Sequence, residues 1–204
     1  MEAKVSTIKE WLGEGSINVF GMPFAGKDTQ GKKLAELLGG NLLGGGDILR
    51  NSVIPQHVKE MMDAGDLVPI EDYLQIVLPY LSSEQFQGKP LILSSVGRWK
   101  GEEEGVMEAA TNSGHPLKAV IELTVSESVA RERHAAAQDE ERGQRVDDAI
   151  DVITTRFKEF HSKTRPVLER YDELGLLIEV DGTPSEPKIT QEIIEQLYLR
   201  ATST

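Results

Sequence analysis

The sequence contains no cysteine, and only 5% of its 204 residues are aromatic. The absence of cysteine excludes disulfides, thiolate nucleophiles and thiolate metal ligands, so the core alone must hold the fold together. No apolar run approaches the roughly 20 residues that a membrane-spanning helix needs, and residues 1–15 lack the apolar segment of a secretory signal. We therefore expect a cytoplasmic protein without a membrane partner.

Positive charge is also scarce, with 22 Lys and Arg against 34 Asp and Glu and a net charge of −12. This balance disfavours nucleic acid as a partner, because binding to a phosphate backbone depends on clustered Lys and Arg that release counterions. Basic residues that converge on one site are therefore informative in this chain. Its length and a hydrophobic content of 39% predict one domain with a full core.

Short apolar runs rich in Val, Ile and Leu alternate with amphipathic stretches. The runs at residues 16–20, 90–96, 119–125 and 176–180 predict strands, and residues 41–43 predict a weaker one. Buried strands that alternate with helices are typical of a parallel sheet covered on both faces. The sequence thus predicts an α/β fold in three layers, with a five-stranded parallel sheet between helices.

Apolar residues at three- and four-residue steps predict the longest helix over residues 147–174, with a kink at Pro166. A final helix is expected near residues 187–199, with a proline suited to its first turn. Residues 1–15 suggest a further short helix packed on the domain through Ile8, Trp11 and Leu12.

Residues 21–29 read GMPFAGKDT and contain the GxxxxGK core of a phosphate-binding loop, placed between a strand and a helix as the motif demands. The glycines allow successive backbone N–H groups to point at phosphate oxygens, and the helix N-terminus adds its positive end. A glycine turn that merely joins strand to helix is the alternative, and Lys27 argues against it. The expected hydroxyl comes one residue late, at Thr29 rather than at Asp28.

This loop resembles the GxPGxGKGTQ loop of adenylate kinases at Gly21, Pro23, Gly26, Lys27, Thr29 and Gln30. Later segments resemble the family in order: GDILR at 46–50, MDAGDLV at 62–68, Arg98 after the strand PLILSSV, RVDD at 145–148, Arg156, TRPVL at 164–168 and VDG at 180–182. The resemblance covers roughly residues 17–197, and several ordered motifs are far more specific than one loop.

The resemblance implies a P-loop NTPase-like fold over residues 1–204, with a monophosphate-binding insertion at 47–81 and a short lid near 137–144. It implies reversible transfer of the γ-phosphoryl group of ATP to AMP, giving two ADP, with Mg²⁺ as cofactor and a monomeric state. Positioning, charge neutralisation and exclusion of water are what phosphoryl transfer mainly asks of a protein.

The resemblance also implies residue roles. Lys27 would hold the β- and γ-phosphates of ATP, Arg50 and Arg98 would grip the acceptor's α-phosphate, and Arg133 would lie over the donor base. Arg145 and Arg156 would span the transferring group. The residues expected to bind ATP are Gly21, Pro23, Phe24, Ala25, Gly26, Lys27, Asp28, Thr29, Gln30 and Arg133. Those expected to bind the acceptor are Gly45, Arg50, Met62, Asp66, Leu67, Val68, Ser95, Arg98, Glu102, Arg145 and Arg156.

The chain departs from the family in ways that bear on charge and metal. Ser94 stands where the family has an aspartate that holds magnesium through water, and we expect Asp28 to take over, with Thr29 close to the metal. Ala137 replaces a second lid arginine, for which Arg142 could compensate. In addition, Phe24 replaces a glycine and Gly45 a threonine.

Glu102 stands where adenylate kinases have a glutamine that reads adenine. An ionised glutamate only accepts hydrogen bonds, and guanine offers two adjacent donors, so Glu102 could favour GMP. Alternatively, Glu102 points to solvent and the backbone near Val68 reads adenine, and AMP stays the preferred acceptor. Two further alternatives are a kinase for another small acceptor, such as a sugar or shikimate, and a regulatory nucleotide-binding protein without transfer activity, which Ser94 and Ala137 motivate.

Overall fold

The structure is a computed structural model that describes residues 1–139 and 150–203. Its centre is a five-stranded sheet in the order β2-β3-β1-β4-β5, in which all neighbouring strands are parallel. The strands are β1 (Ser16–Gly21), β2 (Asn41–Gly44), β3 (Leu91–Ser94), β4 (Leu117–Thr124) and β5 (Leu177–Asp181). The predicted parallel sheet is thus confirmed, and the weakest predicted strand is the edge strand β2.

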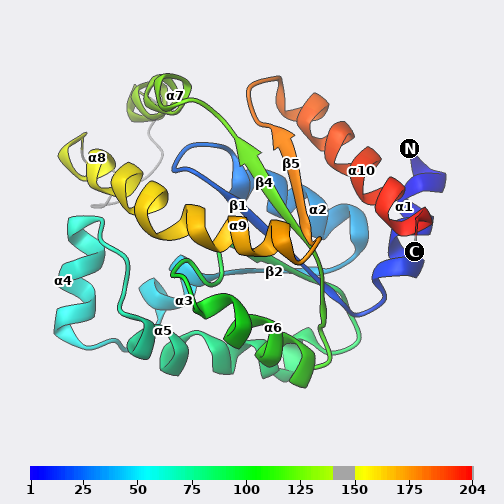
Figure 1. The fold of residues 1–204 in the computed structure, drawn as a ribbon, viewed down its shortest axis with the longest axis horizontal. Coiled ribbons are helices and arrows are strands. Elements are labelled where there is room, and N and C mark those ends of the chain that lie inside the picture. The colour runs from blue at the N-terminus through cyan, green and yellow to red at the C-terminus, as the bar shows by residue number, and fades with distance from the viewer. Residues whose placement is uncertain (140–149, 204) are drawn as a thin grey trace.

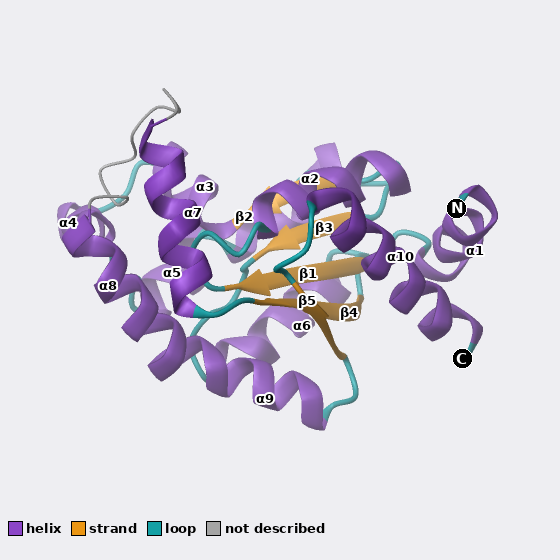
Figure 2. Ribbon diagram, turned by 90° about the horizontal axis from the view of Figure 1, so that it is seen from above, coloured by secondary structure: helices purple, strands orange, loops and turns teal. Residues whose placement is uncertain are grey.

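Helices cover both faces of this sheet (Figure 2). On one face, α1 (Glu2–Leu12), α2 (Lys27–Leu38) and α10 (Glu186–Thr202) share a core with apolar side chains of β1, β3, β4 and β5. On the other face lie α6 (Glu102–Asn112) and α9 (Arg165–Glu173), whose side chains pack in two further clusters. The three-layer arrangement explains why the strands read as continuous apolar runs rather than as alternating ones.

The N-terminal segment forms the expected short helix. Ile8 and Leu12 of α1 are 0% and 1% exposed, and Trp11 packs against the same core. The helix lies beside α10, and both ends of the chain are on this side of the molecule (Figure 1).

Five short helical elements connect β2 to β3. They are α3 (Gly45–Asn51), α4 (Gln56–Ala64), α5 (Ile70–Ile76) and the 3₁₀ turns η1 (Leu78–Ser82) and η2 (Glu84–Phe86). The α4 helix lies away from the sheet and next to α8 (Ile150–Glu159) (Figure 1). These elements contain the predicted insertion at 47–81, whose limits as a unit stay a prediction.

The long helix predicted over residues 147–174 is interrupted. It consists of α8, a π-helical turn η4 (Phe160–Thr164) and α9, while its predicted start lies outside the described residues. The π-helical turn ends two residues before Pro166, which lacks the N–H group needed for a regular i→i−4 helical hydrogen bond. The predicted disturbance at Pro166 is therefore present as a change of helix type.

The predicted lid falls mostly outside the described residues. Residues 137–139 end α7 (Glu127–Asp139), and residues 140–144 are among those that the structure does not describe. Among the described residues, no helix is both long and apolar enough to cross a membrane.

The strand order determines where a ligand can bind. The chain passes from β1 to β2 on one side and later to β4 on the other, so the strand order reverses at β1. Ligands of open parallel sheets bind at such a point, beyond the carboxyl ends of the strands. The loops after β1 and β3 lie at that edge.

Candidate functional site

The loop after β1 has the backbone shape of a phosphate-binding loop. A Cβ at Gly21 would lie 2.9 Å from the Cβ of Ala25 and 3.0 Å from the carbonyl oxygen of Leu123, so only glycine fits there. Gly26 has a φ of 97°, a left-handed value that glycine adopts without strain, and α2 begins at the next residue, Lys27. The loop thus delivers Lys27 and the positive end of α2 to the carboxyl edge of the sheet.

Phe24 holds the loop in shape despite replacing a glycine. Its φ is 63°, a left-handed value that costs a non-glycine residue about 1–2 kcal/mol. Its ring packs edge-on against His134 of α7, with 4.9 Å between ring centroids. This contact compensates for the strained backbone.

Arg133 of α7 braces the loop from outside. Its guanidinium donates to the carbonyl oxygens of Phe24 and Ala25 at 3.4 and 3.3 Å, and to those of Gly182 and Thr183 at 2.7 and 3.3 Å. Its hydrogen-bonding edge is therefore used within the protein. Stacking of its planar face on a donor base stays a prediction.

Thr29 and Gln30, two predicted ATP-binding residues in the first turns of α2, differ in their exposure to solvent. Thr29 is exposed near the start of α2, whereas the side chain of Gln30 is 1% exposed and faces α10. Gln30 donates to the carbonyl of Glu186 at 3.1 Å and accepts from the hydroxyl of Thr190 at 2.8 Å. The side chain of Gln30 thus joins two helices rather than facing the cleft.

The loop after β3 is held by two buried side chains. Asn18 of β1 donates to the carbonyl of Val96 at 2.7 Å and accepts from its N–H at 3.3 Å. The hydroxyl of Tyr73 accepts from the N–H of Gly97 at 2.9 Å. A Cβ at Gly45 would lie 2.7 Å from that hydroxyl, so Tyr73 fills space next to the position where the family has a threonine.

This loop presents Arg98 to the cleft. The Nε of Arg98 is buried and has no hydrogen-bond partner among the described residues. Burial lowers the pKa of Arg98, and the nearby charges of Arg156 and Arg50 act in the same direction. The guanidinium groups of Arg156 and Arg50 are therefore close enough to Arg98 to repel it, an arrangement that an anionic ligand would stabilise.

Arg50 and Arg156 reach the cleft from separate helices. Arg50 of α3 donates to Asp47 at 2.6 Å, one turn earlier in the same helix. Arg156 belongs to α8, and α8 lies against the end of α4 at Gly65. A Cβ at Gly65 would lie 2.5 Å from a methyl of Val152 and 3.1 Å from the Cγ of Arg156, so glycine permits this close approach.

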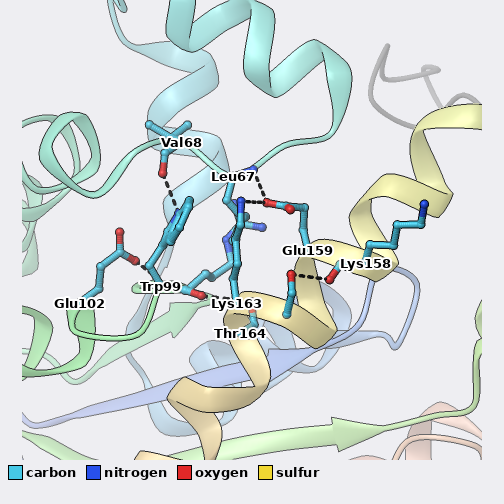
Figure 3. Close-up of polar contacts among 10 residues, drawn as sticks. Leu67, Val68, Trp99, Glu102, Lys158, Glu159, Lys163 and Thr164 are labelled. Atoms are coloured by element: carbon cyan, nitrogen blue, oxygen red, sulfur yellow. Dashed lines mark hydrogen bonds and ion pairs between the residues drawn. The ribbon is translucent and has the colours of Figure 1, made fainter.

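A polar cluster joins the segment after α4 to the π-helical turn (Figure 3). Glu159 accepts from the N–H of Leu67 at 3.1 Å and forms an ion pair with Lys163. Lys163 lies over the ring of Trp99, 3.9 Å from its centroid, and Trp99 donates from Nε1 to the carbonyl of Val68 at 2.9 Å. The cluster holds Leu67 and Val68 against the loop that carries Arg98.

Glu102 is 1% exposed, so the alternative in which it points to solvent is wrong. Its Oε2 accepts from the N–H groups of Arg98 and Trp99 at 2.6 and 2.9 Å, while its Oε1 is buried without a hydrogen-bond partner among the described residues. Burial raises the pKa of this carboxyl, against the opposing effect of the two N–H groups. The carbonyl of Val68 accepts from Trp99, but a carbonyl oxygen can accept a second hydrogen bond, so reading of adenine by the backbone near Val68 stays a prediction.

One cleft brings most of the predicted acceptor residues together with four of the predicted ATP-binding residues. Its lining includes Gly21, Pro23, Lys27, Asp28, Arg50, Met62, Asp66, Leu67, Val68, Ser95, Arg98 and Arg156. The other predicted residues that the structure describes are not part of this lining: Phe24, Ala25, Gly26, Thr29, Gln30, Gly45, Glu102 and Arg133. Arg145 and Arg142 lie outside the described residues.

The sequence reasoning missed several residues that build this cleft. Asn18 and Tyr73 position the loop after β3, and Glu159 with Lys163 lines or supports the acceptor side. A polar Asn18 inside an apolar strand was a signal that something must satisfy it. The other three carry no local pattern that sets them apart from ordinary core or surface residues.

An ion pair with a buried carboxylate further supports the helix on which the cleft rests. Arg165, at the start of α9, donates to both carboxylate oxygens of Glu122 at 2.8 and 2.6 Å, and Glu122 is 1% exposed in β4. Such a two-pronged contact fixes direction as well as distance. It orients the end of the π-helical turn toward the sheet, where Thr164 joins the lining of the cleft.

The glycine-bearing loop and its lysine meet the guanidinium groups in a single cleft at the carboxyl edge of a parallel sheet. Loop, helix N-terminus and arginines are the groups that bind polyphosphates and stabilise a transferring phosphoryl group. Fold and cleft together define a P-loop protein of the phosphoryl-transfer class.

Comparisons with known proteins identify the family within this class. The adenylate kinase family model matches residues 19–176. The adenylate kinase of Micrococcus luteus is 30% identical over 185 residues, which cover 88% of this chain and 89% of that protein. The adenylate kinase of Cyanothece sp. is 32% identical over 187 residues, covering 88% of this chain and 94% of the relative. That of Mycobacterium tuberculosis is 33% identical over 173 residues, covering 82% and 92%. The chain belongs to the adenylate kinase family, and is accordingly a nucleotide-binding phosphotransferase with ATP as phosphoryl donor.

Proposed function

We propose that this protein catalyses the reversible transfer of the γ-phosphoryl group of ATP to AMP, giving two ADP. An oxygen of the acceptor's α-phosphate attacks the γ-phosphorus, the new P–O bond forms as the bond to the β–γ bridging oxygen breaks, and ADP leaves. The observation that carries this proposal is the single cleft that the phosphate loop and the arginines of three other segments line together.

On the donor side, Lys27 and the loop backbone hold the β- and γ-phosphates of ATP. The contacts of Phe24 with His134 and of Arg133 with the loop carbonyls support this role, because they hold the loop rigid before ATP arrives. A preorganised loop loses little on reorganisation when charge develops in the transition state.

On the acceptor side, Arg50 and Arg98 bind the α-phosphate of AMP, and Arg156 contacts the transferring group together with Arg145. Arg50 and Arg156 both repel the guanidinium group of Arg98, and a bound phosphate relieves this repulsion, which supports the assignment. Met62, Asp66, Leu67, Val68 and Ser95 line the same side of the cleft and enclose the acceptor nucleoside.

Magnesium is the metal that the oxygen groups of this cleft fit. Among the described residues there is no group of three or more His, Cys, Asp or Glu side chains suited to a metal ion. Magnesium in phosphoryl-transfer sites is commonly held by one or two protein oxygens together with substrate phosphates, and Asp28 and Thr29 offer such oxygens. When bound, the ion neutralises charge on the β- and γ-phosphates.

One observation favours a second acceptor. The Oε1 of Glu102 is buried and lacks a partner among the described residues, and an ionised carboxylate can accept from the ring N–H of guanine but cannot donate to the ring nitrogen of adenine. GMP is therefore the alternative acceptor. A silent regulatory protein and a kinase for another small acceptor remain less favoured, because Lys27, Arg50, Arg98 and Arg156 are all retained in one family-like cleft.

A coupled assay of ADP formation from ATP with AMP, GMP, CMP or UMP tests the proposal. We expect turnover with AMP, strict dependence on the acceptor, and loss of turnover in Lys27→Met. Binding of ATP without turnover with any acceptor would contradict the kinase assignment and support the regulatory alternative. We further propose that the protein acts as a monomer in the cytoplasm without a nucleic-acid partner, in line with its net charge of −12.

A further inference from the structure

Two positions in P-loop proteins commonly hold magnesium. The residue directly after the loop lysine supplies a Ser or Thr hydroxyl, and an aspartate elsewhere supplies a carboxylate. In this chain the residue after Lys27 is Asp28, and the family's aspartate at the end of β3 is replaced by Ser94. Asp28 stands where the family's loop has a glycine, and the hydroxyl follows at Thr29, so this chain has a carboxylate at residue 28 and none at residue 94.

The structure brings these two side chains into contact. The hydroxyl of Ser94 donates to the Oδ1 of Asp28 at 2.6 Å, across the gap between β3 and the first turn of α2. β3 is the direct neighbour of β1, with Ser94 paired to Val19. Both side chains line the cleft beside Lys27. A carboxylate at residue 28 therefore reaches the same region that a carboxylate at residue 94 would occupy.

We propose that Asp28 is the carboxylate through which this protein recognises nucleotide-bound magnesium, and that Ser94 positions it. The inference rests on the proposed function, since it assigns the metal side of the same site. The hydrogen bond from Ser94 fixes the orientation of the carboxylate within the cleft, as hydrogen bonds to metal-binding carboxylates commonly do.

The carboxylate of Asp28 has an electrostatic consequence for nucleotide binding that a residue which only capped α2 would not have. A carboxylate next to Lys27 repels the phosphates of metal-free ATP and attracts those of Mg²⁺–ATP, so Asp28 must widen the difference in affinity between the two ligands. An acidic residue that only stabilises the N-terminus of α2 would affect the binding of both ligands alike, through the helix.

Five proteins test the proposal: wild type, Asp28→Ser, Asp28→Asn, Ser94→Asp and the double variant in which the side chains of residues 28 and 94 are exchanged. The affinity for ATP is measured by calorimetry, once with excess Mg²⁺ and once with EDTA, so the readout does not depend on turnover. Asp28→Asn serves as a second neutral variant of similar size, and thermal melting shows whether each variant is folded.

We expect Asp28→Ser and Asp28→Asn to bind ATP at least as tightly as wild type in EDTA. The factor by which Mg²⁺ increases the affinity for ATP should be roughly 10–100-fold smaller in these variants than in wild type. Ser94→Asp places two carboxylates together, so its melting temperature should fall in EDTA and recover with Mg²⁺. The exchanged double variant should regain most of the magnesium-dependent gain in affinity.

Equal weakening in Mg²⁺ and in EDTA by Asp28→Asn would overturn the proposal in favour of a structural role. The proposal would also be overturned if Asp28→Ser kept the full magnesium-dependent increase in ATP affinity. A folded double variant whose increase is as small as that of Asp28→Ser would overturn it too. Failure of the proposed function looks different: wild type would then bind ATP and form no ADP with any nucleoside monophosphate.

Discussion

The two sides of the cleft are built in different ways. The donor side is contiguous, since residues 21–29 supply the loop, the lysine and the helix N-terminus. The acceptor side combines Arg50, Arg98 and Arg156 with the segment at 65–68, which four different elements or connections deliver. A local motif thus specifies one half of the site, whereas tertiary packing specifies the other.

This difference predicts how each side fails. On the donor side, a single substitution should abolish most of the activity while leaving the fold nearly unchanged. Damage to the acceptor side should also arise from positions that act through packing, because Tyr73, Lys163 and the close approach at Gly65 set the distances there.

The largest effect is expected for Lys27→Met, which removes the cation of the donor side while keeping its apolar stem. Loss of one preorganised charged contact to a transferring group lowers kcat by about 10²–10³-fold. Steady-state kinetics with saturating ATP and AMP measure it. Lys32→Met, an exposed position on the same helix, is the matched control and should leave kcat unchanged. A Lys27→Met variant with more than a tenth of wild-type kcat would contradict the role of this lysine.

Arg98→Lys tests the acceptor side with charge retained. A lysine cannot meet two phosphate oxygens with a planar fork, so kcat/KM for AMP should fall by about 10–100-fold, corresponding to one charged hydrogen bond. The KM for ATP should change little. Arg170→Lys, at an exposed ion pair with Glu173, controls for the substitution itself. If kcat/KM fell equally for AMP and for ATP, Arg98 would not act specifically on the acceptor side of the cleft.

Gly65→Ala separates packing from backbone strain. Gly65 and Gly88 have left-handed φ values of 83° and 74°, but only at Gly65 would a Cβ meet neighbours, the nearest at 2.5 Å. Gly88→Ala should cost about 1–2 kcal/mol of unfolding free energy from φ alone. Gly65→Ala should cost about 1–3 kcal/mol more and raise the KM for AMP. Denaturant unfolding with both variants makes the comparison, and equal losses would refute the close approach of α4 and α8.

The smallest effect concerns the acceptor base. The pKa of Glu102 is raised by burial, so its protonated form persists above the ordinary range of a glutamate and can then donate as glutamine does. As the pH rises through that pKa, the ratio of GMP to AMP turnover should increase several-fold. The ratio cancels the titration of the phosphates, which both acceptors share. In Glu102→Gln the ratio should be low and independent of pH, and a slope that persists in this variant would assign the effect to another group.

The sequence predicted the position of the phosphate loop and of Lys27, whereas the contacts of the individual residues with ATP stay predictions. The side chain of Gln30 is one that the structure places away from the cleft. Gln30 was expected at the nucleotide because it belongs to the loop motif. It recurs at four-residue spacing with Leu34 and Leu38, however, and all three are buried on one face of α2. Helical periodicity was therefore a local signal that the side chain of Gln30 faces the core.

The acceptor side could be predicted only as a set of arginines. Their positions relative to one another depend on contacts between residues far apart in the chain, such as Asn18 with Val96 and Trp99 with Val68. The change from α- to π-helix at residues 160–164 was also not foreseen beyond the expected disturbance at Pro166. Periodicity does not distinguish these helix types over a single turn.

We propose that one cleft holds two nucleotides, with Lys27 on the donor side and Arg98 on the acceptor side. Calorimetric binding of a bisubstrate dinucleotide, two adenosines joined by five phosphates, tests it most directly. The account predicts one ligand for each chain and a loss of affinity of at least about tenfold in both Lys27→Met and Arg98→Lys. Two ligands for each chain, or full affinity in either variant, would contradict it.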